Sequence, residues 1–509
     1  MKARSNPLYL RLSGYAAILT LFAAWPLFAG KSAKFFFHDH FFVQLQIFKG
    51  LSLPTNDLSP VWGNFLDLLP QRESIFYFLV FSTIALCGAL SLFLLKKLLV
   101  RLELTPPYPF TVGAFALALF LRYAASGTDV CLTVPAIFAA AIALFDAMSA
   151  QKNVFPKGLL AGLCLTLMIL CRFDTVLFAG TFALVFYFVF NGKEPISLKN
   201  FPKLLTSLLI GLAPAVVFAL FQKREYGTFV PETVASWGQH QGSTPWYAFV
   251  VLFVSPFKSM IRNPSALPFM TFPAVLLCLV AYHSLPWVEV KRSPRDTVFL
   301  SLIWYPLAAL TVWALFTQIL IPTYAMYPLA VGGPVALAYA LSTIESKIKD
   351  NEKEKTLAKK AWTGLGFLLF LLACLIPFER KNAVLETLTR EVAAFAKEHG
   401  GTYAAGAPIS AAAVEAGVKT VRLNGIAGDE KIREFLSAQA DLMPVFKDKD
   451  VDWYVGVNIG GDNGCYHLRE PAQNAFGTNK GMSAWLCREP VRIVEPVSGL
   501  KIFFFNVRG

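Results

Sequence analysis

Charged residues are scarce in this sequence. Asp, Glu, Lys and Arg make up only 16% of its 509 residues, whereas 55% are hydrophobic. A soluble enzyme of this length would carry more charge, because water-facing surfaces are rich in charged side chains. Apolar runs long enough to cross about 30 Å of hydrocarbon recur through most of the chain. The sequence therefore predicts a polytopic α-helical membrane protein.

A nucleic-acid-binding motif is also missing, although the net charge is +13. Lys and Arg instead gather in short segments between the apolar runs, on the side that also holds the basic N-terminus. The positive-inside rule assigns that side to the cytoplasm. The basic segments are 96–101, 152–157, 193–203, 291–295 and 347–360.

The first apolar run lacks a clear small-residue cleavage site, so we expect a retained helix rather than a signal peptide. The chain then holds about eleven spans, and an odd number places its two ends on opposite sides. The apolar segment 246–260 is short and is expected to be interfacial or re-entrant. The predicted spans are 9–30, 73–95, 109–126, 130–150, 157–172, 174–191, 203–221, 266–284, 297–317, 322–343 and 361–378.

The face opposite the basic loops is expected to be extracytoplasmic. Within the predicted transmembrane domain, 1–378, it holds the long loops 31–72 and 222–265. The tail, 379–509, lies on the same face, and we predict that it forms a soluble α/β domain. A helix is expected at 385–399, and the expected strands include 452–458 and 501–507.

Cysteine is infrequent, with eight residues in the chain. Six lie in apolar spans, where they are expected to pack as small hydrophobic residues. Cys465 and Cys487 are the two in the tail. In an extracytoplasmic, oxidising compartment they are predicted to form a disulfide.

Ionisable residues at the edge of a membrane are costly and are therefore candidates for function. Four segments with such residues share the predicted outer face. That all four share one face is informative, because the topology is predicted from the Lys and Arg residues of the basic segments and not from these four segments. These segments are HDH (38–40), SGTD (126–129), RFD (172–174) and the loop 223–242.

Each segment also has a simpler interpretation. HDH contains ligand types suited to a divalent metal ion, or Asp39 is an ordinary loop acid. Asp129 is placed to cap the helix that follows it. Arg172 and Asp174 are placed to form a structural ion pair, and the loop 223–242 is placed to act as a connector.

The functional interpretation is a cavity at the outer leaflet. A carboxylate there can remove a proton from an acceptor hydroxyl. Cationic side chains can hold and neutralise a leaving phosphate, while a groove between helices holds a lipid chain. This combination suits glycosyl transfer from a polyprenyl-phosphate sugar.

Six motifs in a fixed order resemble those of GT-C class glycosyltransferases that use lipid-phosphate-linked sugars. The resemblance is closest to the mycobacterial terminal arabinofuranosyltransferases and the type IV pilin arabinosyltransferases. This sequence departs from the family pattern at His40, where a second Asp is typical, and at Glu232, where Asn is typical. The motifs are DHFFVQLQIFKGL (39–51), SGTDVCL (126–132), RFD (172–174), YGTFVPET (226–233), YAMYP (324–328) and LNGIAGD (423–429).

The resemblance implies a role for each matching residue. Asp39 is the expected general base, with His40 orienting it or contacting the donor phosphate. No residue is assigned as a metal ligand, and whether a divalent metal ion serves as a cofactor is left open. The expected phosphate-binding residues are His38, Arg172, Lys223, Arg224, Lys258 and Arg262. The expected sugar- or acceptor-binding residues are Asp129, Asp174, Tyr226, Glu232, Thr233, Trp237, His240, Tyr324 and Tyr327.

The resulting hypothesis is an enzyme of the bacterial cytoplasmic membrane. It moves a sugar, D-arabinofuranose by resemblance, from a polyprenyl phosphate to a hydroxyl of a pilin-like protein or a glycan. Alternatives are transfer of mannose or aminoarabinose, a lipid flippase, an O-antigen ligase and a secondary transporter. A transporter typically has broken helices in two repeated halves, and no such repeat is visible in the sequence.

Overall fold

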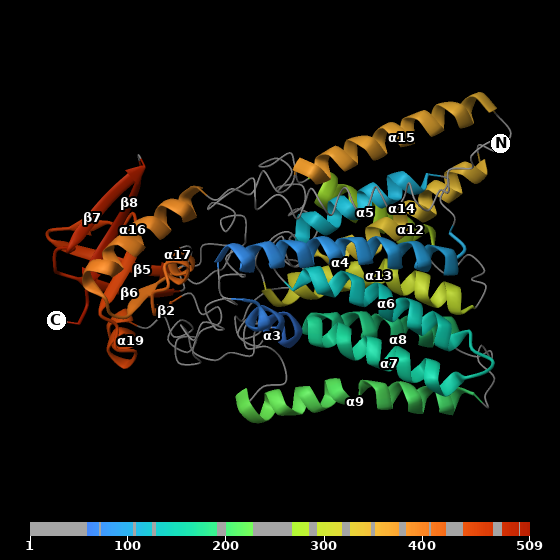
Figure 1. The fold of residues 1–509 in the computed structure, drawn as a ribbon, viewed down its shortest axis with the longest axis horizontal. Helices are drawn as coiled ribbons and strands as arrows, with labels where there is room; N and C mark the ends of the chain where they lie inside the picture. Colours follow the sequence, from blue (N-terminus) through green and yellow to red (C-terminus); the bar gives the residue numbers. More distant parts are fainter. Residues whose placement is uncertain are drawn as a thin grey trace.

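Helices make up the described chain up to residue 375, and a domain of two sheets follows (Figure 1). The computed structural model describes residues 59–70, 73–104, 108–124, 129–190, 200–226, 267–284, 293–317, 326–347, 352–375, 383–406, 409–423, 441–471, 481–497 and 499–508.

The helical region follows the predicted apolar runs, because in an apolar run a helix satisfies every backbone hydrogen bond within its own segment. Its elements are α3 (Pro60–Leu68), α4 (Glu73–Arg101), α5 (Pro109–Ala124), α6 (Val130–Met148), α7 (Val154–Cys171), η2 (Phe173–Thr175), α8 (Val176–Phe190), α9 (Phe201–Tyr226), η3 (Leu267–Thr271), α12 (Phe272–His283), α13 (Pro294–Thr317), α14 (Pro328–Lys347) and α15 (Glu352–Leu375).

Membrane-spanning length is reached by five helices among the described residues, and three shorter helices are also apolar. This supports a membrane protein. The total of eleven spans stays a prediction, and its first span, 9–30, lies outside the described residues.

Successive helices run in alternating directions across the bundle (Figure 1). The start of α6, the end of α7 and the start of α14 therefore share one end. The C-terminal domain follows α15 at this same end. The basic segments 96–101 and 152–157 lie at the other end. Asp129 and Arg172 thus lie at the end of the bundle from which the C-terminal domain follows, and which compartment this end faces is still a prediction.

The contact between α7 and α9 depends on small residues. A Cβ atom at Gly162 would lie 2.8 Å from Cα of Gly211, and one at Gly211 would lie 2.6 Å from the carbonyl oxygen of Leu159. The Thr166 hydroxyl donates to the Gly211 carbonyl at 2.8 Å. Small residues that let two backbones approach this closely are typical of helix pairs in membranes.

We predict that Gly162→Leu destabilises the protein by about 1–3 kcal/mol or more, because the added side chain must push two helices apart. Gly180→Leu is the matched control, since a Cβ there meets no heavy atom within 4 Å. Thermal unfolding in detergent measures both. Equal melting temperatures for the two variants would contradict the packing described here.

The C-terminal domain contains a five-stranded mixed sheet in the order β2-β1-β3-β8-β7 and a three-stranded antiparallel sheet in the order β4-β5-β6. The predicted helix 385–399 and strands 452–458 and 501–507 are confirmed as α16, β3 and β8. The elements are α16 (Ala383–His399), β1 (Tyr403–Ala405), α17 (Ile409–Glu415), β2 (Thr420–Arg422), α19 (Leu442–Asp448), β3 (Trp453–Val457), β4 (Gly461–Asp462), β5 (Cys465–Pro471), β6 (Gly481–Leu486), β7 (Arg492–Val497) and β8 (Leu500–Asn506).

Alternate residues of β8 face two different apolar cores, as the two-residue period of a strand requires. Phe504 stacks on Phe395 of α16, with ring centroids 4.2 Å apart. Phe503 and Phe505 belong to the core on the other face of the sheet, together with Leu468 of β5. In the three-stranded sheet, the structure joins Cys465 to Cys487 by a disulfide.

Glu470 of β5 is buried, with 8% of its surface exposed. The Tyr454 hydroxyl donates to its Oε1 atom at 2.9 Å, and the backbone N–H of Gly406 donates to the same carboxyl group. Burial raises the pKa of Glu470 from its ordinary value of 4.5 to about 7, although both hydrogen bonds act to lower it. The carboxyl group therefore holds its proton more tightly in the folded protein than in the unfolded chain.

This shift predicts a pH dependence of stability. Because the pKa of Glu470 is higher in the folded protein than in the unfolded chain, the stability that this group contributes is fully present below pH 4.5. This contribution is lost as the pH rises through 7. The loss is on the order of 3 kcal/mol. Melting temperatures from pH 5 to pH 8 should fall more steeply for the wild type than for Glu470→Gln. Parallel curves would contradict the burial argument.

Candidate functional site

The turn between α7 and α8 carries Arg172. The residue is the C-cap of α7 in an extended conformation (φ −165°, ψ 120°), and its backbone N–H donates to the Met168 carbonyl. The Thr175 hydroxyl donates to the carbonyls of Met168 and Arg172, at 3.0 Å and 2.6 Å. These bonds tie the turn to the end of α7 and fix the direction in which the Arg172 side chain leaves it.

The Arg172 guanidinium binds two carboxylates. Its Nη1 atom lies 3.0 Å from Oδ1 of Asp129, and its Nε atom lies 2.9 Å from Oδ1 of Asp174. The Arg172 side chain is only 10% exposed. A buried carboxylate, that of Asp129, and a half-buried one, that of Asp174, therefore share one buried cation. Such an arrangement persists only when hydrogen bonds compensate for lost hydration.

Asp129 immediately precedes α6, where a helix cap was one interpretation of the sequence. Its side chain makes no capping hydrogen bond and is directed to Arg172 instead. The capping interpretation is therefore wrong for this carboxylate. The interpretation of Arg172 and Asp174 as an ion pair is confirmed, and Asp129 joins that pair from a different helix.

Two tyrosines complete this group. The Tyr327 hydroxyl donates to Oδ1 of Asp174 at 3.0 Å, and its ring lies under the guanidinium of Arg172, with Cζ 4.9 Å from the ring centroid. The Tyr305 hydroxyl lies 2.8 Å from that of Tyr327. We call Asp129, Arg172, Asp174, Tyr305 and Tyr327 the Arg172 cluster.

Tyr305 was not predicted from the sequence. It lies in the middle of α13 and is fully buried, with Phe178 edge-on to its ring at 5.4 Å. A tyrosine deep in an apolar helix needs a partner for its hydroxyl. This requirement predicts from the sequence that the Tyr305 hydroxyl has a hydrogen-bond partner, but the sequence does not show which residue the partner is.

The chemistry of the Arg172 cluster is that of a fixed anionic wall. One guanidinium and two carboxylates leave a formal charge of −1. Carboxylate oxygens accept hydrogen bonds from hydroxyl groups, and a sugar carries several such groups. A phosphate bound at Arg172 would have to share the guanidinium with Asp129 and Asp174.

The remaining predicted site residues lie elsewhere or outside the described residues. Lys223 and Arg224 are exposed in the last turn of α9, and Tyr226 ends that helix. Among the described residues, no group of three or more His, Cys, Asp or Glu could hold a metal ion. Outside the described residues lie His38, Asp39, His40, Glu232, Thr233, Trp237, His240, Lys258, Arg262 and Tyr324.

The fold is similar to that of a known membrane enzyme. The oligosaccharyltransferase of the archaeon Archaeoglobus fulgidus, in its apo form, matches with a TM-score of 0.52 at 12% sequence identity, over 88% of this chain and 69% of that one. The same enzyme tethered to an acceptor peptide matches with a TM-score of 0.49 at 12% identity, over 87% and 69%. No protein-family model and no curated protein matches the chain.

The match to the apo enzyme shows a shared fold. The architecture expected from the sequence, a helical membrane region followed by a C-terminal sheet domain, agrees with this fold. The arabinofuranosyltransferase subtype stays a prediction.

We predict that Arg172→Met destabilises the protein by about 3–5 kcal/mol, because it leaves the buried carboxylate of Asp129 and the half-buried one of Asp174 without a cation. The control is Arg101→Met. Arg101 pairs with Asp146 at the basic end, with both side chains 35% exposed, and loss of that pair should cost less than about 1 kcal/mol. Thermal unfolding in one detergent compares them. Similar losses would show that the Arg172 cluster is not a buried ionic network.

Proposed function

We propose that the protein is a membrane glycosyltransferase that moves a sugar from a polyprenyl-phosphate carrier to a hydroxyl group. The observation that carries the proposal is the Arg172 cluster, which collects four of the site residues predicted from sequence. It lies at one end of a helical bundle whose fold is that of an oligosaccharyltransferase.

The reaction requires a base, a leaving-group stabiliser and a sugar-binding wall. Asp39 takes the proton of the acceptor hydroxyl, and the acceptor oxygen forms a bond to the anomeric carbon of the sugar. The bond from that carbon to the phosphate oxygen breaks, and the polyprenyl phosphate leaves. Cationic side chains stabilise the phosphate, for which Lys223 and Arg224 at the end of α9 are candidates.

The Arg172 cluster serves as the sugar-binding wall in this proposal. Asp129 and Asp174 accept hydrogen bonds from sugar hydroxyls, while Arg172 fixes the direction of both carboxyl groups. A wall that is rigid before the sugar arrives loses little entropy on binding. Arg172 is thus primarily a positioning residue, which refines the phosphate-binding role expected from the resemblance.

The sugar is D-arabinofuranose in this proposal, and the acceptor is a pilin-like protein or a glycan. Both follow from the sequence resemblance, with mannose and aminoarabinose as the alternative sugars. The site faces the periplasm of a bacterium, the N-terminus is cytoplasmic, and the soluble domain, 379–509, lies on the side of the site.

A transfer assay tests the proposal. Purified protein in lipid nanodiscs is incubated with radiolabelled polyprenyl-phosphate arabinofuranose, polyprenyl-phosphate mannose or polyprenyl-phosphate aminoarabinose, and with pilin and glycan acceptors. We expect transfer by the wild type from the arabinofuranose donor. A wild type that transfers no sugar from any of these donors would contradict the proposal.

Three Asp→Asn variants assign the roles. Asp39→Asn should lower the rate by 10²-fold or more, as loss of a general base does. Asp174→Asn should lower it by about tenfold, because one charge-assisted hydrogen bond is worth about 1.5 kcal/mol. Asp146→Asn at the opposite end is the control and should keep the full rate. Full activity of Asp39→Asn would refute its assignment as the base.

A further inference from the structure

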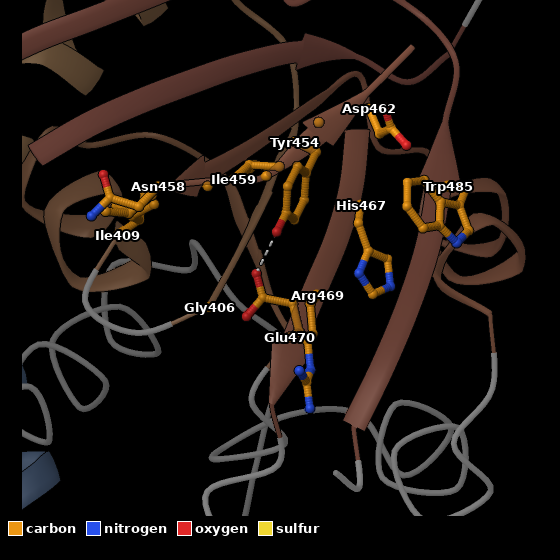
Figure 2. Close-up of a pocket in the computed structure, with 14 residues that line it drawn as sticks. Gly406, Ile409, Tyr454, Asn458, Ile459, Asp462, His467, Arg469, Glu470 and Trp485 are labelled. Carbon is orange, nitrogen blue, oxygen red and sulfur yellow. Dashed lines mark hydrogen bonds between the residues drawn. The ribbon is translucent and has the colours of Figure 1, made fainter. Parts of the chain in front are cut away.

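The C-terminal domain contains a cavity that the proposed transfer reaction does not use. It has a volume of about 560 Å³ and lies between β5 and the segment from Tyr454 to Asp462 (Figure 2). This volume is in the range of pockets that hold small-molecule ligands. None of its lining residues belongs to the Arg172 cluster.

One wall of the cavity is aromatic. His467 of β5 and Trp485 of β6 are cross-strand neighbours, and their rings stack with centroids 4.7 Å apart and 15° between the planes (Figure 2). Stacking on the imidazole holds the indole in place, yet Trp485 is 60% exposed. The pair thus presents a fixed, flat apolar surface that a ligand can cover.

The cavity also contains polar groups of both signs. The carboxyl group of Glu470 is buried against the Tyr454 hydroxyl. Arg469 and Asp462 also line the cavity and lie on the face of β4 and β5 that carries His467 (Figure 2). A ligand with a single net charge would meet a like charge here. Hydroxyl groups both donate and accept hydrogen bonds, so a ligand with several hydroxyls finds a partner for each role.

Glycines bring backbone close to this polar wall. A Cβ atom at Gly406 would collide with the carboxylate of Glu470, and one at Gly456 would lie 2.5 Å from Cδ1 of Ile459. Gly460 and Gly461 also line the cavity. Glycine at such positions allows a close approach of backbone to its neighbours or to a ligand.

We propose that this cavity binds one neutral sugar residue, with its apolar ring face on the stacked rings of His467 and Trp485 and its hydroxyls bonded to Arg469 and Asp462, which lie on the same face of the three-stranded sheet. An aromatic platform beside mixed polar groups matches the two faces of a sugar ring, one rich in C–H bonds and one rich in hydroxyls. The site is separate from the Arg172 cluster, and its existence does not depend on the proposed transfer activity.

Saturation-transfer NMR on the full-length protein, in a detergent without a sugar headgroup, tests this proposal. The probes are free D-arabinose, D-mannose, D-galactose and N-acetylglucosamine. We expect saturation transfer to the ring protons of at least one sugar and a decrease of at least fivefold in Trp485→Ala. The control is Ile493→Ala, on β7 of the same domain, where the residue is 50% exposed and lies outside the cavity. It should keep the wild-type signal.

Two results would overturn the proposal. One is that no sugar gives a signal above that of Trp485→Ala. The other is a signal that survives in Trp485→Ala and is lost in Asp174→Asn, which would place the bound sugar at the Arg172 cluster. Because Trp485 is a surface residue, Trp485→Ala should fold. Asp462→Asn is a second variant, expected to weaken the signal by loss of a charged acceptor.

Discussion

A single buried guanidinium, that of Arg172, holds two carboxylates together, and the arrangement of several helices depends on it. Asp129 comes from the start of α6, Asp174 from the turn before α8, and Tyr327 from the start of α14. Removing water from these groups is expensive, so each must find its partner inside the protein. The ionic network therefore fixes how the ends of these helices meet.

The helices themselves are positioned by a different interaction. Where Gly162 and Gly211 meet, the backbones of α7 and α9 are in direct contact, and apolar packing fills the rest of the bundle. Because consecutive helices alternate in direction, the Arg172 cluster and the C-terminal domain lie at the same end (Figure 1). The proposed transfer from a lipid-borne donor requires such a placement of a polar site beside the C-terminal domain.

The helices could be predicted from the sequence because hydropathy and length are local properties. Asp129, Arg172, Asp174 and Tyr327 were predicted as site residues because polar side chains at a membrane edge are costly and because they fall in the motifs of a known family. The pairing of Arg172 with Asp174 could be predicted because the two residues are close in sequence. The pairing of Asp129 with Arg172 could not, since these residues lie 43 residues apart. The same limit applies to the pairing of β1 with β3 and to the cavity beside Glu470, which depend on contacts between distant segments.

The central claim is that the Arg172 cluster acts as one unit in sugar transfer. A double-mutant cycle of Asp129→Asn and Tyr327→Phe, measured as the initial rate of transfer from a polyprenyl-phosphate sugar, tests it most directly. The account predicts strong coupling, with a double variant that loses no more than about tenfold beyond the worse single variant. Losses that simply multiply, or single variants with the wild-type rate, would contradict it.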